Sequence, residues 1–168
     1  MKLIGIAGGA LLAAMVAGPV AAQDLGLPVG SDAPRLAVKD LDGRPVDLGQ
    51  WVGKKPVLIE FWATWCENCE ALLPKLASAR ARVGDRVEFI GINVTVNQTP
   101  ERVRRYMAEH ELPFRVLYDT EGASVRAFAA PATSYVVLID RGGKILYTGV
   151  GPDQEFDASL DRAAGITQ

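Results

Sequence analysis

The chain has 168 residues, of which 49% are hydrophobic and 23% are charged, and its formal net charge is −2. This composition is typical of one globular domain large enough to bury its own core, and it argues against a disordered chain. Because the basic residues are scattered singly or in short groups, a nucleic acid is not an expected partner.

The first 22 residues predict an export signal. After Lys2 no charge occurs until Asp24, the stretch between them is apolar, and Pro19 is followed by small residues before Gln23. We therefore predict a secretory signal peptide over residues 1–22, a single domain over residues 23–168, and a periplasmic or other extracytoplasmic location. The alternative is an uncleaved membrane anchor, because the uncharged run approaches the roughly 20 residues that span a bilayer.

An N-terminal β-hairpin is predicted after an extended lead-in over residues 23–34. Residues 35–38 and 45–48 are short strand candidates on either side of a turn at residues 40–43, whose sequence is Asp-Leu-Asp-Gly. A helical turn is expected over residues 47–52, and Gly53 ends it.

The middle of the chain alternates between apolar runs and helical patterns. Residues 57–62 and 87–94 read as central strands buried on both faces. Between them a helix should start at the cysteines, contain a kink at Pro74 and stop at Gly84. Its expected inward face consists of apolar residues at helical spacing: Ala71, Leu72, Leu73, Leu76, Ala77 and Ala79.

The last third of the chain predicts a βαββα-like ending. Thr99 caps a helix that carries Val103 and Met107 inward, and the charges of residues 101–105 are interpreted as its solvated face. A strand over 114–118, a short helix over 123–128, a β-hairpin of 134–139 with 144–147 and a helix over 153–164 follow. The order of elements predicts an α/β domain.

Cys66 and Cys69 are the only cysteines, and they lie at a predicted strand-to-helix junction. A disulfide across so short a loop restrains little chain entropy, so the spacing favours redox chemistry over stapling. Cys66, at the helix N-terminus, is expected to have a lowered pKa and to attack, and Cys69 to resolve. Zinc would need about four ligands, and with two cysteines and His110 we expect neither a metal nor a cofactor.

Glu60 interrupts the apolar strand six residues before Cys66. A buried carboxylate is costly unless it has a partner or a role, so we expect a raised pKa and a function as proton acceptor for Cys69. The alternative is a carboxylate at the strand end that pairs with Lys54 or Lys55.

Residues 61–69, with the sequence Phe-Trp-Ala-Thr-Trp-Cys-Glu-Asn-Cys, resemble the active-site segment of the thioredoxin superfamily. More narrowly, the chain is similar to exported TlpA-like (ResA-type) thiol–disulfide oxidoreductases. The further matches are a Gly-x-x-Ala-Pro opening at residues 30–34, Pro74, and an Asp-x-x-Gly turn at residues 140–143. The resemblance implies a thioredoxin-like fold, with a central mixed β-sheet flanked by helices and the N-terminal hairpin as an extension.

The resemblance also implies substrate-binding residues. Trp65 is expected beside the disulfide on an apolar docking surface. The family places a cis-proline opposite the disulfide, and Pro131, nine residues before Asp140, is the candidate. The alternative is that Ser134 occupies this position.

The predicted function is an exported thiol–disulfide oxidoreductase that acts as a reductant and works as a monomer. It would receive electrons from a membrane thiol donor and reduce disulfide-containing envelope proteins, with apocytochrome c as one candidate from the resemblance. Glu67 favours this direction weakly, because a negative charge beside Cys66 disfavours its thiolate. The alternatives are a disulfide-forming oxidant, a copper-binding metallochaperone and a thiol peroxidase, for which no separate peroxidatic cysteine is present.

Overall fold

The computed structural model describes residues 26–166. The predicted signal peptide over residues 1–22 lies outside the described residues, and so does the choice between cleavage and anchoring. Within residues 26–166, no helix has both the length and the apolar character that a membrane crossing requires.

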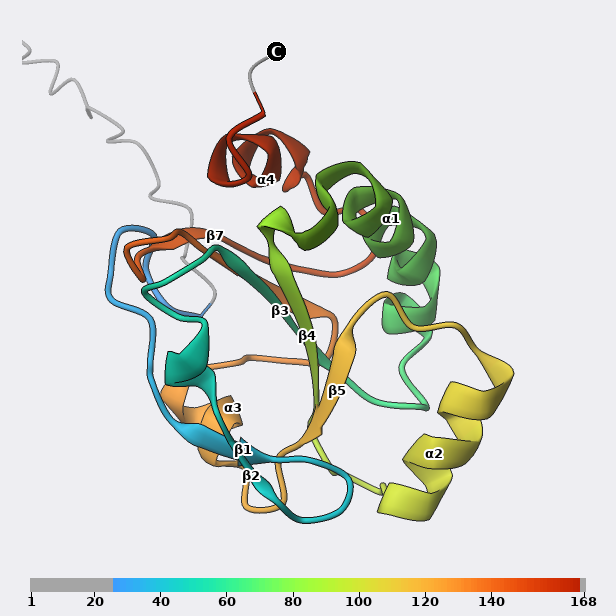
Figure 1. The fold of residues 1–168 in the computed structure, drawn as a ribbon. Helices are drawn as coiled ribbons and strands as arrows, with labels where there is room; N and C mark the ends of the chain where they lie inside the picture. The colour runs from blue at the N-terminus through green and yellow to red at the C-terminus, as the bar shows by residue number, and fades with distance from the viewer. Residues whose placement is uncertain (1–25, 167–168) are drawn as a thin grey trace, which may run out of the picture.

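Seven strands form one mixed sheet in the order β2-β1-β5-β4-β3-β6-β7 (Figure 1). The strands are β1 (Ala37–Lys39), β2 (Pro45–Asp47), β3 (Val57–Trp62), β4 (Glu88–Asn93), β5 (Arg115–Tyr118), β6 (Tyr135–Ile139) and β7 (Ile145–Val150). The central strands β3, β4 and β5 are parallel, and the β1–β2 and β6–β7 hairpins pair antiparallel at the two sides. The predicted α/β fold, mixed sheet and N-terminal hairpin are confirmed.

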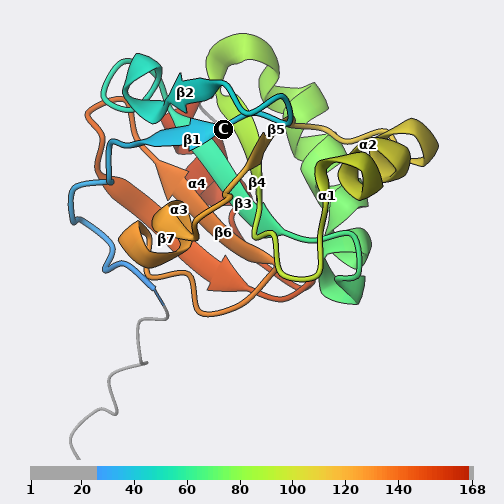
Figure 2. The same cartoon turned by 90° about the horizontal axis from the view of Figure 1, so that it is seen from below.

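Four α-helices flank the sheet: α1 (Glu67–Val83), α2 (Pro100–Glu109), α3 (Ala123–Ala127) and α4 (Asp157–Ala163). Two 3-10 turns, η1 (Leu48–Gln50) and η2 (Gly84–Arg86), complete the elements. Helices α1 and α4 cover one face of the sheet and α3 the other, as Figures 1 and 2 show. The predicted helix signals hold, since Thr99 caps α2 through its side chain and Gly84, at φ +57°, ends α1.

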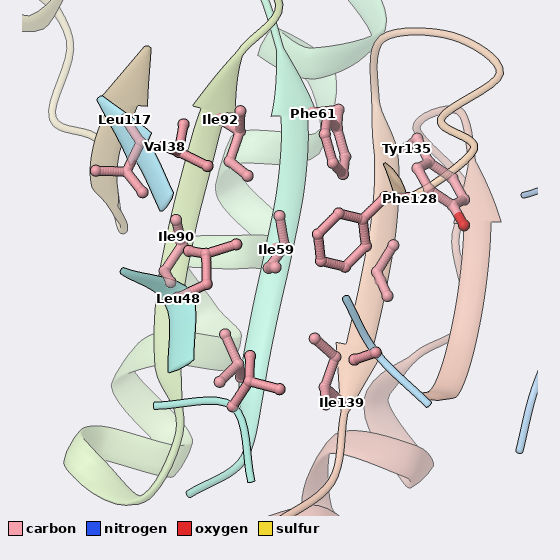
Figure 3. Packing of buried hydrophobic residues seen from close by; sticks show 14 of the residues in the cluster. Val38, Leu48, Ile59, Phe61, Ile90, Ile92, Leu117, Phe128, Tyr135 and Ile139 are labelled. Carbon is pink, nitrogen blue, oxygen red and sulfur yellow. The ribbon is translucent and has the colours of Figure 1, made fainter. Parts of the chain in front are cut away.

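Strand β3 is buried along its whole length, as its apolar run predicts. Successive side chains of a strand point to opposite faces, so Ile59 and Phe61 enter the cluster on the α3 side (Figure 3). There the Phe61 ring lies 5.6 Å from that of Phe128 and 5.8 Å from that of Tyr135. Leu58 joins the opposite cluster, which packs α1 and α4 against the sheet.

Three helix expectations are corrected in detail. Met107 is 39% exposed, because Val103 alone forms the fully buried contact of α2. Ala71 and Ala77 lie on the solvent side of α1, whose buried stripe is narrower than the apolar pattern. Helix α4 starts at Asp157, four residues later than predicted, because the chain before it forms an irregular loop.

Candidate active site

The two cysteines form a disulfide at the start of α1, with their Cα atoms 5.2 Å apart. Cys66 is the N-cap of the helix, and its sulfur accepts a hydrogen bond from the Cys69 backbone N–H at 3.1 Å. This confirms the predicted placement of Cys66 at a helix N-terminus, where free N–H groups and the helix dipole favour a thiolate. Both side chains are almost fully buried, Cys69 (4% exposed) more so than Cys66 (8%).

Trp65 is exposed next to the disulfide, with 44% of its surface accessible. Its indole N–H donates to the backbone oxygen of Val96 at 2.7 Å, and Val96 is itself 58% exposed. Trp65 therefore presents exposed apolar surface next to Cys66 in the chain, and the backbone of Val96 holds its ring. This arrangement is compatible with the docking role predicted for Trp65, which stays a prediction.

The side chain of Gln98 also joins the loop before Cys66 to the loop after β4. The Gln98 side-chain oxygen accepts hydrogen bonds from the Thr64 backbone N–H at 3.1 Å and from the Asn93 amide at 3.3 Å. Gln98 is 9% exposed, and its backbone oxygen accepts from the Tyr118 hydroxyl. The loop that carries Trp65 and Cys66 is therefore held in position by the hydrogen bonds of Gln98.

Glu60 lies at the middle of the sheet with no exposed surface. Neither of its carboxylate oxygens has a hydrogen-bond partner among residues 26–166, and burial raises its pKa to about 8. The predicted pKa increase is confirmed. The alternative, a pair with Lys54 or Lys55, is wrong, because Glu60 pairs with neither and Lys55 binds Glu88 at 3.1 Å.

The strand geometry directs Glu60 toward the cysteines. Leu58, Glu60 and Trp62 share the face of β3 that α1 covers. Leu58 packs in the cluster with the α1 leucines, and Trp62 packs in the cluster that contains both cysteines. Glu60 stands between these two contacts, on the side of the sheet where Cys69 is buried.

The predicted cis bond before Pro131 is wrong, since no peptide bond among the described residues is cis. Pro131 is exposed in the loop before β6. Ser134 directly precedes β6 and is fully buried at φ +58°. In the β3–β6 register Phe61 pairs with Tyr135, so Ser134 follows beside Trp62, at the edge of the sheet where the chain continues to Cys66. The register thus favours the alternative, Ser134, over Pro131 for this position, and its place opposite the disulfide stays a prediction.

Ser134 is held by a glutamine that the sequence analysis did not identify. The Gln154 side-chain amide donates to the backbone oxygens of Ser134 at 2.8 Å and Gly151 at 2.7 Å. The Ser134 hydroxyl in turn accepts from the Gly151 N–H at 3.0 Å. No local sequence pattern identifies Gln154, because its partner Ser134 lies 20 residues away.

Gln98 could have been found from the sequence. The loops that follow neighbouring parallel strands meet at the same edge of the sheet, so the loop after β4 was bound to adjoin the loop after β3. Gln98 is a polar residue in the loop after β4, just before the Thr99 cap, and was therefore a candidate for contact with Thr64.

Comparisons with known proteins agree with this geometry. The family model described as Redoxin matches residues 28–163. The chain is 29% identical over 144 residues to the thioredoxin-like protein YneN of Bacillus subtilis, covering 83% of this chain and 82% of that protein. It is also 29% identical over 123 residues to the thiol-disulfide oxidoreductase ResA of Bacillus subtilis, covering 73% of this chain and 67% of that protein.

A solved structure shows the same arrangement of elements. The crystal structure of a thiol:disulfide interchange protein of the thioredoxin family from Chlorobium tepidum aligns with a TM-score of 0.65 and 25% identity. The alignment covers 81% of this chain and 97% of that one.

Proposed function

The chain belongs to the Redoxin family, with a thioredoxin-like fold of the TlpA/ResA type, and on that premise we propose that it exchanges disulfides with partner proteins as a reductant. Its relatives identify it as a thiol–disulfide oxidoreductase. What we propose is the direction of electron transfer, the partner proteins and the location. The observation that carries it is the Cys66–Cys69 pair at the N-terminus of α1, with Glu60 buried nearby and without a hydrogen-bond partner in the described part of the chain.

In the proposed reaction the reduced pair supplies two electrons. The Cys66 thiolate attacks one sulfur of a partner disulfide, which breaks that S–S bond and releases the other partner sulfur as a thiolate. Cys69 then attacks the Cys66 sulfur of the mixed disulfide, closes the Cys66–Cys69 bond and releases the second partner thiol. The disulfide in the structure corresponds to the product state of this sequence.

Glu60 is the proposed proton acceptor for Cys69. A thiol must lose its proton before it attacks, and Cys69 is only 4% exposed, so water has little access to it. Burial raises the pKa of Glu60 to about 8, close to the about 8.5 of a free thiol, so the ionised fraction of Glu60 can accept the Cys69 proton.

The reducing direction is supported by the charges at the start of α1. Glu67 and Glu70 are the acidic residues of its first turn, and no basic residue stands between the cysteines. Negative charge near Cys66 opposes the thiolate that the helix N-terminus favours, and a less stabilised reduced form is a stronger reductant.

The proposed setting is the bacterial envelope or another extracytoplasmic space. The support is the signal-like sequence of residues 1–22 together with the resemblance to the exported TlpA-like group. Disulfide-containing envelope proteins, with apocytochrome c as one candidate, would be the oxidised partners, and a membrane thiol donor would restore the dithiol.

The test is an insulin-reduction assay combined with a redox equilibrium against glutathione. We expect catalysis, its loss in Cys66→Ser, and a stable mixed disulfide with the substrate in Cys69→Ser. The reduction potential should be nearer the about −270 mV of thioredoxin than the about −120 mV of a strong disulfide-forming oxidant. A strongly oxidising couple would overturn the reductant proposal and favour the oxidant.

The copper-chaperone alternative would need a ligand beyond the two cysteines. His110, the only histidine, caps the C-terminus of α2, and its ring stacks on Tyr106 at 3.9 Å. Its Nδ1 atom faces the Tyr106 backbone oxygen at 3.0 Å. Tight copper binding without disulfide exchange would favour this alternative.

A further inference from the structure

A hollow of about 450 Å³ opens between the loop before Cys66 and helix α2. We call it the α2 hollow, and its lining residues are Thr64, Arg102, Arg105, Tyr106 and Glu109. Thr64 stands two residues before Cys66, and Tyr106 packs against the cluster that contains both cysteines. One wall of the hollow therefore belongs to the loop that leads to Cys66, and the other packs against the cluster that contains the cysteines.

Two guanidinium groups dominate the charge of the α2 hollow. Arg102 and Arg105 are exposed one turn apart on α2, and the Nε atom of Arg102 donates to the Thr64 hydroxyl at 3.1 Å. Within residues 26–166 neither arginine belongs to an ion pair, whereas Arg104 on the same helix binds Asp42 at 2.7 Å. The remaining N–H groups of a guanidinium match the two oxygens of a carboxylate.

The other lining groups complete a site for an acid. The Tyr106 hydroxyl has no hydrogen-bond partner among residues 26–166, so it is free to donate. Among the lining residues, two arginines against Glu109 leave a net charge of +1, and the charge of Glu70 acts on the Tyr106 hydroxyl from α1. Glu67 and Glu70 on the first turn of α1 give the surface around the disulfide the opposite sign.

From these contacts we infer that the α2 hollow binds an Asp or Glu side chain of the partner segment that presents its disulfide to Cys66. The inference rests on the proposed function and adds a substrate preference to it. The first turn of α1 is acidic, whereas the α2 hollow is basic. The preference for an acidic residue therefore depends on which side of the partner cysteine that residue occupies.

The test uses a set of disulfide peptides of one length. In each peptide the two residues on one side of the attacked cysteine are both Glu, both Gln or both Lys, and the rest of the sequence is the same. A second set carries the same residues on the other side. For each peptide, kcat/KM for reduction is measured at low and high salt. We expect the Glu peptide of one set to exceed its Lys counterpart about threefold to tenfold, with the Gln peptide between them and the ratio smaller at high salt.

Three variants separate the α2 hollow from general electrostatics. The double variant Arg102→Gln/Arg105→Gln should bring the Glu-to-Lys ratio close to one. Arg104→Gln removes one positive charge from the same helix outside the hollow, half of what the double variant removes, and should keep the ratio. Glu109→Gln should raise the Glu-to-Lys ratio, and a misfolded variant could not produce such an increase.

Equal rates for Glu and Lys peptides in both sets, or a ratio that survives the double variant, would overturn the α2 hollow as a carboxylate site while leaving the proposed function intact. If no peptide is reduced by the dithiol protein, the proposed function fails and this inference fails with it.

Discussion

The side-chain oxygen of Gln98 lies 3.1 Å from the backbone nitrogen of Thr64, and this hydrogen bond joins the loop after β4 to the loop that carries the cysteines. Gln98 is nearly buried, and the same oxygen also accepts from Asn93. The position of Trp65 and Cys66 thus depends on a contact made by a residue about 30 positions further along the chain.

Replacing Gln98 by Leu should destabilise the protein and disturb the active-site loop. The change leaves the Thr64 N–H and the Asn93 amide without their acceptor, at a cost of about 1–3 kcal/mol in the free energy of unfolding. Urea unfolding measures this cost, and insulin reduction measures the loss of activity. Gln50→Leu, at an exposed position, is the matched control, and an effect as small as that of the control would contradict the structural role of Gln98.

Replacing Gly91 by Ala should destabilise the sheet beside Glu60. Gly91 pairs with Glu60 in the β3–β4 register, and a Cβ atom there would overlap the Phe114 ring, which packs at 5.7 Å from the ring of Trp62. We expect a loss of about 1–3 kcal/mol in the free energy of unfolding. In Gly91→Ala/Phe114→Leu the smaller side chain makes room, so the double variant should lose less than the sum of the single variants. Strict additivity would show that the ring is not what the new methyl group meets.

The central half of the fold could be predicted because its signals are local. The apolar run of β3 and the helical spacing of α1 are visible in the sequence, and Gly84 and Thr99 mark helix ends by their chemistry. Met107 was predicted to be buried from the same spacing, but Val103 is the one fully buried residue of α2 and Tyr106 is only partly buried. Burial of a helix depends on its partner surface, which periodicity alone does not contain.

The cysteines and Glu60 could also be predicted, because a charged residue within a buried strand and a closely spaced cysteine pair are visible without a structure. The residues that support them were missed for a physical reason. Gln154 acts through a contact with Ser134 that closes only when distant segments meet. Arg102 and Arg105 were interpreted as a solvated face, and only the structure places them beside Thr64.

Replacing Gln154 by Met should loosen the segment that precedes β6. Met fills a similar volume but donates no hydrogen bond, so the backbone oxygens of Ser134 and Gly151 lose their shared donor. We expect the free energy of unfolding to fall by about 1–3 kcal/mol in urea titrations. Tyr147→Phe removes the long 3.4 Å contact to Gln154 but keeps both donations of the Gln154 amide, so it should cost less stability than Gln154→Met. Equal effects of the two variants would contradict the anchoring role of Gln154.

Replacing Glu60 by Gln should remove a pH dependence from the stability of the oxidised protein. Burial raises the Glu60 pKa to about 8 in the folded state, from 4.5 in the absence of the fold, so between these values the folded protein binds a proton that the unfolded chain does not. The contribution of this bound proton to the free energy of unfolding is therefore fully present below about pH 4.5 and is lost as the pH rises through about 8. Within that window the free energy of unfolding of the wild type should fall by up to about 1.4 kcal/mol per pH unit.

The same titration separates Glu60 from the surface acids. Glu60→Gln should give a flatter profile between pH 5 and 8 and, at pH 8, a more stable protein than the wild type, because a neutral amide has no charge to bury. Glu121→Gln, at an exposed position, should retain the wild-type slope. If Glu60 is also the proton acceptor for Cys69, Glu60→Gln should prolong the lifetime of the mixed disulfide with insulin even though the protein is more stable. A stabilised variant that resolves the mixed disulfide at the wild-type rate would show that Glu60 strains the fold without serving the exchange.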